Sequence, residues 1–146
     1  MKYLSKNFTL EELIYSGKAK TLGIDNTPGQ KEIENLEKLA TKILQPIRDK
    51  YGKPIKVTSG YRSPSVNSAV GGAKTSQHLD GEAADIFVGE DNSKLFQLIK
   101  DMIEKGEIIC GQLIWEYGNK KQPRWIHISL PGVKFKNQII YKYDKK

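Results

Sequence analysis

The sequence predicts an α+β fold in which a mostly antiparallel sheet packs against helices. Three observations support this prediction: helical patterns dominate residues 1–52, strand patterns dominate residues 112–143, and no internal repeat or linker divides the 146 residues. This length is close to the most common size of a single domain and is sufficient for one hydrophobic core. We therefore expect residues 1–146 to form a single domain.

Two capping patterns mark the starts of the N-terminal helices. In each, a hydroxyl residue that can act as N-cap is followed three residues later by a glutamate or glutamine, and the second pattern also has a proline at the first helical position. We expect a short helix over residues 9–16, a loop over 16–29, and a long amphipathic helix that Pro46 kinks or splits and that ends at 51–52. The capping residues are Thr9 and Glu12 for the first helix, and Thr27, Pro28 and Gln30 for the second.

The rest of the chain alternates between strand patterns and two further helices. Ser63 followed by Pro64 predicts a short helical turn, and apolar residues at helical spacing predict a helix from Asp91 to Lys105. Alternating apolar and polar residues, bounded by glycine and proline, predict the strands. The expected strands cover residues 54–59, 83–88, 112–117, 125–129 and 138–143.

The composition limits the classes of function. The net charge of +7 favours anionic partners, but the lysines are scattered and no basic run alternates with aromatics, so we expect a solvated basic surface and no nucleic-acid partner. Cys110 is the only cysteine, which excludes an intramolecular disulfide, and its apolar surroundings predict a buried core residue. No signal peptide or membrane span is expected, because the chain has no apolar run of about 18 residues.

Four polar residues interrupt or adjoin apolar strands. His127 shares a strand face with Trp125, whereas the isoleucines of that strand occupy the other face. Asp85 and Glu116 likewise lie midway along or at the end of apolar strands, and His78 precedes a predicted turn. An ionised carboxylate in such a place requires a partner, because an isolated buried charge is very costly.

A metal ion is one possible partner for these groups. His78, Asp85 and His127 offer nitrogen and oxygen ligands that suit Zn²⁺, and three protein ligands leave a fourth position for water, as in catalytic zinc sites. Spacing alone leaves another interpretation open, because buried histidines often have hydrogen-bond partners and acids near turns often cap them.

The residues between the histidines carry a more specific signal. The chain reads Ser76-x-His78-x-x-Gly81-x-Ala83-x-Asp85, followed some forty residues later by Trp-x-His. This pattern, together with the segments "NFTLEEL", "VTSGYRSPSVNSAVGG" and "QLIWEY", resembles the zinc D-Ala-D-Ala carboxypeptidase family of metallopeptidases. That family also includes vancomycin-resistance D,D-dipeptidases and phage L-Ala-D-Glu endopeptidases. The chain looks closest to the small single-domain, phage-type branch, and a hedgehog-like D-Ala-D-Ala-peptidase fold is implied.

The resemblance implies roles for particular residues. His78, Asp85 and His127 match the family's zinc ligands, and Gly81 would permit the turn between the first two. Arg62 matches an arginine that binds and polarises the substrate near the scissile amide, although an arginine there can also simply pair with a nearby acid. Ser76 could hydrogen-bond close to the ligands or be an ordinary loop hydroxyl.

The catalytic acid is the point at which this sequence departs from several relatives. Where those relatives have an acid, three residues before the last histidine ligand, this chain has Arg124. In this branch the resemblance points to Glu116 as general base, and its strand parity places it away from Leu113, Trp115 and Tyr117. Asp80 and Glu82 are expected to be solvated turn residues, and Trp125 is expected to be either a wall of the cleft that contacts substrate or core.

Together these residues predict a zinc-dependent peptidase of peptidoglycan stem peptides, either a D-Ala-D-Ala carboxypeptidase or an endopeptidase with an endolysin-like role. The alternatives are a cell-wall peptide-binding module of the same fold that cuts nothing, and a nucleic-acid-binding protein indicated by charge alone. We expect a monomer, made in the cytoplasm without a signal peptide, that acts on the cell wall after phage-mediated delivery or release.

Overall fold

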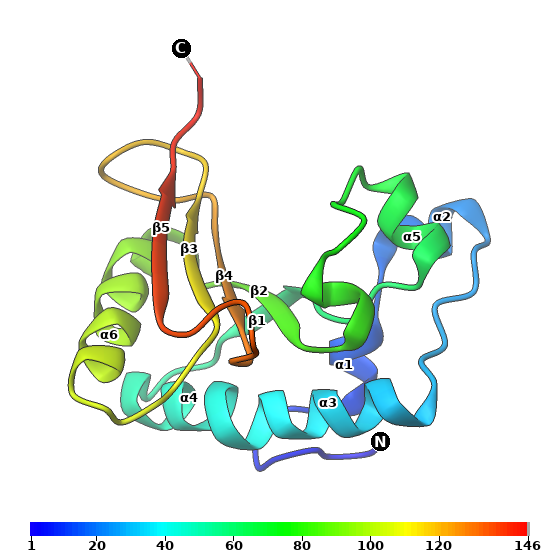
Figure 1. Cartoon of the computed structure of the whole chain (residues 1–146), viewed down its shortest axis with the longest axis horizontal. Coiled ribbons are helices and arrows are strands. Elements are labelled where there is room, and N and C mark those ends of the chain that lie inside the picture. Colours follow the sequence, from blue (N-terminus) through cyan, green and yellow to red (C-terminus); the bar gives the residue numbers. More distant parts are fainter. Residues whose placement is uncertain (146) are drawn as a thin grey trace.

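A five-stranded sheet lies at the centre of the computed structural model, which describes residues 1–145 (Figure 1). The strand order is β1–β2–β4–β3–β5. Three neighbouring pairs are antiparallel, and β3 and β5 are parallel. This mixed sheet confirms the predicted α+β fold with a mostly antiparallel sheet. The strands are β1 (Lys56–Ser59), β2 (Ala83–Phe87), β3 (Gln112–Glu116), β4 (Trp125–Ser129) and β5 (Gln138–Lys142).

The helices cover one face of the sheet and one end of it (Figure 1). A continuous helical run and α6 pack against the sheet, and the smaller helices gather beyond β1 and β2 (Figure 1). The run consists of α3 (Gln30–Leu39), the π-helical turn η1 (Ala40–Leu44) and α4 (Gln45–Tyr51). The other helices are α1 (Leu10–Ile14), α2 (Gly17–Leu22), α5 (Pro64–Ala69), the 3₁₀ turns η2 (Gln77–Asp80) and η3 (Gly89–Asp91), and α6 (Asn92–Glu104).

The prediction of a loop over residues 16–29 is wrong for its first half, because helix α2 occupies residues 17–22. The Ser16 hydroxyl accepts a hydrogen bond from the Ala19 N–H at 3.1 Å, and Gly23 closes the helix in the left-handed conformation. Only Ala19 of this helix is buried. Because the helix is short and has no apolar stripe, its caps are the only signals in the sequence.

The start of the long helix also differs from the prediction. Gly29, rather than Thr27, is the N-cap, and the Glu32 carboxylate accepts a hydrogen bond from the Gly29 N–H at 3.0 Å. The Thr27 hydroxyl instead donates to Asp25 at 2.6 Å. Thr27 therefore forms an Asx-type contact with Asp25 in the preceding loop and does not cap the helix.

Pro46 alters the long helix without ending it. The helix widens into the π-helical turn η1 immediately before the proline, and the Gln45 N–H donates to the Ala40 carbonyl. Proline cannot donate to the preceding turn, so a local change of hydrogen-bond register accommodates it. The helical run then continues to Tyr51 and ends at Gly52 in the left-handed conformation, as predicted.

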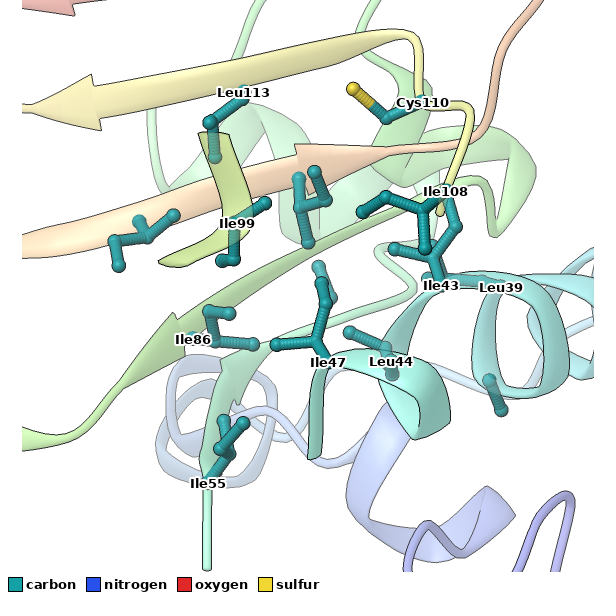
Figure 2. Close-up of a cluster of buried hydrophobic side chains, with 14 of the residues drawn as sticks. Leu39, Ile43, Leu44, Ile47, Ile55, Ile86, Ile99, Ile108, Cys110 and Leu113 are labelled. Atoms are coloured by element: carbon teal, nitrogen blue, oxygen red, sulfur yellow. The ribbon is translucent and has the colours of Figure 1, made fainter. Parts of the chain in front are cut away.

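The hydrophobic core lies between the sheet and the helices (Figure 2). Ile43 and Ile47 from the helical run meet Ile86 of β2, Ile99 of α6 and Leu113 of β3, and all five are fully buried. Alternate residues of the strands therefore point into this core, which leaves the opposite face of the inner strands free for polar groups. Within residues 1–145, no helix has both the length and the apolar character needed to cross a membrane.

Candidate metal centre

Three buried side chains converge on the face of the sheet opposite the core. His78, Asp85 and His127 each offer one ligand atom, and these atoms all lie within 4.8 Å of one another. Oδ1 of Asp85 lies 3.3 Å from Nε2 of His78 and 3.1 Å from Nδ1 of His127. The two imidazole rings meet edge to face, with their centroids 5.2 Å apart. The structure thus brings together the three residues that the resemblance implied as zinc ligands.

Strand pairing and one tight turn position these three groups. β2 and β4 pair so that Asp85 lies directly opposite His127. His78 lies on η2, where the Ser76 hydroxyl accepts a hydrogen bond from the His78 N–H at 3.2 Å. Gly81 ends η2 with a φ of +73°, a backbone conformation that favours glycine, and so returns the chain to β2 as predicted.

The donor set fits a metal cation. Nδ1 of His78 lies 2.7 Å from the Gly60 carbonyl, which can only accept, so this nitrogen carries the proton. The Nε2 lone pair of His78 therefore faces the carboxylate oxygen of Asp85, and two acceptors at this distance require a cation or a proton between them. A backbone carbonyl that fixes the tautomer of a histidine ligand is a common feature of metal sites.

The charge state of Asp85 is consistent with this arrangement. Burial acts to raise the pKa of this carboxyl, but the adjacent His78 and His127 more than offset the effect and hold the pKa well below its usual range. Asp85 is therefore ionised at neutral pH, as a carboxylate ligand must be.

Arg62 forms part of the support for Asp85. Its Nη2 lies 3.3 Å from Oδ2 of Asp85, so the two carboxylate oxygens face different partners. Its Nε donates to the Ser59 hydroxyl at 3.1 Å, and its Nη1 donates to Oδ1 of the buried Asn67 at 3.3 Å. The acid that pairs with Arg62 is thus Asp85 itself, and a contact between Arg62 and substrate stays a prediction.

A cleft of about 610 Å³ opens above these residues. Glu116 lines it, and within the sheet this residue pairs with Trp125, two positions along from the pair formed by Ile114 and His127. Since a strand rises about 3.3 Å per residue, Glu116 lies about 7 Å along the sheet from the histidine.

The surroundings of Glu116 favour the protonated form of its carboxyl group. It is half-buried, and within residues 1–145 no side chain forms an ion pair with its carboxylate. Burial, followed by the negative charge of Asp85, raises the pKa of Glu116 above its ordinary value. A raised carboxyl pKa favours proton transfer near neutral pH.

Tyr117 does not lie where strand parity places it. The sequence predicts that it faces the core side, away from Glu116, but it lines the cleft beside Glu116. The reason is its φ of +62°, which turns the chain out of the strand at the first residue after β3. The Tyr117 ring packs edge to face against Trp125, with centroids 5.4 Å apart, so Trp125 forms a wall of the cleft.

The other residues singled out in the sequence are Ser76, the two turn acids and Arg124. Ser76 lines the cleft, but its hydroxyl is engaged in capping η2. Asp80 is exposed as predicted, whereas Glu82 is half-buried and its pKa is raised by that burial. Arg124 forms an exposed ion pair with Asp144 at 2.7 Å and does not line the cleft.

Sequence reasoning missed several residues that line the cleft, and one, Asn67, that does not line it but contacts Arg62. Asn67 gave no signal because its role depends on a contact with Arg62, five residues earlier in the chain, and with the Ala73 carbonyl. Lys142 gave none because β5 is brought next to β3 only by the parallel pairing. The other residues that line the cleft and were not anticipated are Val70, Gly71, Gly72, Ala73, Thr75, Gln77, Gln112, Ile114 and Phe135.

Comparison with known proteins agrees with this geometry. A segment of 47 residues is 51% identical to a zinc D-Ala-D-Ala carboxypeptidase from Streptomyces albus G. The matched segment is 32% of this chain and only 18% of that relative, so the chain spans less than a fifth of its length. The family described as peptidase M15 matches residues 6–129. Since this match includes the three converging residues, Arg62 and Glu116, and extends over most of the chain, the chain belongs to the peptidase M15 family.

Proposed function

We propose that this protein is a zinc-dependent peptidase that hydrolyses an amide bond in the stem peptides of peptidoglycan. The observation that carries the proposal is the convergence of His78, Asp85 and His127 at the floor of a cleft that also holds Glu116. Family membership and the name of the Streptomyces relative support the same chemistry. The net charge of +7 supports attraction to the anionic polymers of a cell wall.

In this proposal, the three converging residues would hold Zn²⁺. When bound, the ion supplies a Lewis acid for the scissile carbonyl and lowers the pKa of a water molecule to about 7. Glu116 accepts the proton of the attacking water and later delivers it to the leaving amine. Its raised pKa suits both transfers, as does the lack of an ion-pair partner for its carboxylate among residues 1–145.

Arg62 has two tasks in this mechanism. Its ion pair with Oδ2 of Asp85 orients the carboxylate so that Oδ1 faces the histidines. Its guanidinium also lines the cleft, where it stabilises the negative charge that develops on the carbonyl oxygen. Asn67 and Ser59 restrain the side chain so that it is preorganised for this role.

The test combines metal analysis with digestion of purified cell walls. We expect about one zinc per chain and the release of peptides whose masses identify the cleaved bond. Absence of zinc from the purified protein, or full activity of His78→Ala, would exclude the mechanism. If wall fragments bind tightly to the zinc-loaded protein without being cut, the protein is a binding module.

Mass spectrometry of the digested muropeptides also distinguishes the finer alternatives. Loss of a terminal D-alanine identifies a carboxypeptidase, and cleavage within the stem or a crosslink identifies an endopeptidase. We propose an endolysin-like role, in which a protein made in the cytoplasm reaches the wall through phage-mediated delivery or release. Lysis of cells on external addition and on co-expression with a phage holin would test that role.

A further inference from the structure

One side of the cleft has a chemistry that the proposed mechanism does not use. Tyr117, Trp125 and Lys142 line the cleft on the same side as Glu116. Lys142 is the residue of β5 that pairs with Glu116 across the parallel β3–β5 ladder, and the Tyr117 N–H donates to the Lys142 carbonyl at 2.5 Å. Three segments thus place an aromatic pair and an ammonium group next to the general base.

Lys142 is available to a ligand. Side chains on one face of a strand recur every second residue. The residues of β3 and β5 next to Lys142 on the cleft face are therefore Ile114, Glu116 and Ile140. Among residues 1–145, no carboxylate lies within ion-pairing distance of its Nζ. An exposed ammonium at the rim of the cleft, with no ion-pair partner among residues 1–145, is a binding group for an anion.

The backbone of Tyr117, which forms one wall of the cleft with Trp125, is strained. A tyrosine with a φ of +62° costs on the order of 1 kcal/mol or more relative to an unstrained residue. The strain moves the ring from the core side of the strand into the cleft, where it packs against Trp125. Strained residues of this kind cluster at binding sites.

The direction of the substrate follows from the proton transfer. Glu116 must deliver a proton to the leaving amine, so the residue on the leaving side of the scissile amide passes beside Glu116. That residue therefore lies against Tyr117, Trp125 and Lys142. The aromatic pair suits its apolar portion, and the ammonium suits a carboxylate.

We propose that Tyr117, Trp125 and Lys142 form the subsite for the leaving-group residue, and that this subsite selects a residue with a free carboxylate. This inference rests on the proposed function, since it takes Glu116 as the proton donor. In a stem peptide, the carboxylate can be the C-terminus of a terminal D-alanine or the free α-carboxylate of a γ-linked D-glutamate.

Matched peptides test the subsite and separate these two sources. One pair ends in D-Ala-D-Ala as the free acid or the carboxamide, and the other contains L-Ala-D-Glu with its α-carboxylate free or amidated. For whichever bond is cut, we expect wild-type protein to prefer the acid by at least about tenfold in kcat/KM, a factor equal to about 1.4 kcal/mol. The preference should appear in KM, and the pair that shows it identifies the source.

Variants then assign the preference to the lysine. Lys142→Met should abolish the preference, because it should weaken the binding of the free-acid peptide and leave the binding of the amide unchanged. Lys42→Met removes the same charge from an exposed site on η1, outside the cleft, and should leave the preference intact. Equal cleavage of acid and amide by wild-type protein would overturn the proposal. So would an equal loss on both peptides in Lys142→Met, which would instead show that Lys142 acts through Glu116.

Binding measurements keep this proposal separate from the proposed function. If wild-type protein cuts none of the peptides, the proposed function fails, and titration of the zinc-loaded protein with each pair, followed by tryptophan fluorescence, still tests the subsite. The subsite is supported if the wild-type protein binds the acid more tightly than the amide and Lys142→Met binds both equally. Equal affinities for acid and amide refute it.

Discussion

Glu116 is the residue that the proposed mechanism uses as general base. Glu116→Gln keeps the size and shape of the side chain but removes the base, so we expect kcat to fall by about 10²–10⁴-fold while zinc content stays unchanged. Steady-state kinetics with metal analysis of the same preparation would measure this. Glu82→Gln, which alters a second half-buried acid outside the main cleft, is the control, and an equal loss there would contradict the assignment.

Tyr117 allows a test in which stability and affinity are expected to move in different directions. Asparagine tolerates a positive φ better than tyrosine, so Tyr117→Asn should relieve backbone strain while removing the ring from the cleft. We expect a melting temperature equal to or above that of the wild type and a several-fold higher KM. Thermal unfolding and kinetics on one preparation would show both. A large fall in melting temperature would indicate that the ring is needed for folding.

Cys110 supplies a prediction about pH. Burial raises the pKa of its thiol from 9.0 to about 11 in the folded protein. Because the folded-state pKa is the higher one, its contribution to stability is complete below pH 9 and is lost as the pH rises from 9 to 11. We expect the native thiol to resist a disulfide reagent at pH 8 and to react fully in denaturant. The unfolding free energy of Cys110→Ala should fall less between pH 9 and 11 than that of wild-type protein.

At the level of elements, the turn after η2 sets the position of His78. A Cβ at Gly81 would lie 2.6 Å from the Glu32 carbonyl oxygen, and the φ of +73° adds strain. We expect Gly81→Ala to destabilise the protein by more than about 1 kcal/mol and to weaken zinc binding. Gly23→Ala is a matched control, because Gly23 has a similar φ of +67° but nothing within 4 Å of the added carbon. Calorimetry and metal titration of both variants would separate the destabilisation caused by the steric contact from that caused by the positive φ.

The elements also show what the sequence predicted and what it could not. Regular alternation predicted β2, β3 and β4, and it placed Asp85 and His127 on one face, because strand parity depends only on local geometry. The prediction that Tyr117 faces the core side is wrong, because this residue is in the left-handed conformation and ends the alternation of the strand. Helix α2 was missed because a six-residue helix with one buried side chain has no periodicity to detect.

The cleft was predictable only in part, for a related reason. The histidines and Asp85 were predicted because their spacing follows a family pattern. The same resemblance pointed to Glu116, and strand parity agreed with that choice. Lys142 and Asn67 enter the site through contacts that depend on the tertiary structure, the parallel β3–β5 pairing and the bond to Arg62. No pattern in the local sequence marks either residue.

For the whole molecule, metal binding and folding should be linked. His78, Asp85 and His127 come from segments that meet only in the folded chain, so the proposed Zn²⁺ would bind the folded state preferentially. At a free zinc concentration of 100 times the Kd, we expect about 2.7 kcal/mol of stabilisation, which corresponds to roughly 10 °C in melting temperature. Differential scanning calorimetry with and without a chelator would measure the shift. Asp85→Asn should lose it, and an unchanged shift in that variant would argue against the centre.

The position of β5 at the edge of the sheet has a consequence for how substrate preference can change. Asp85, His127 and Glu116 lie on the inner strands β2, β4 and β3, respectively, each of which has neighbours on both sides. Strand β5 pairs only with β3. Exchange of the exposed residue at position 142 alters the rim of the cleft without touching a strand that carries the proposed chemistry. A protein built in this way can acquire a new peptide specificity through a single peripheral strand while the proposed metal centre stays constant.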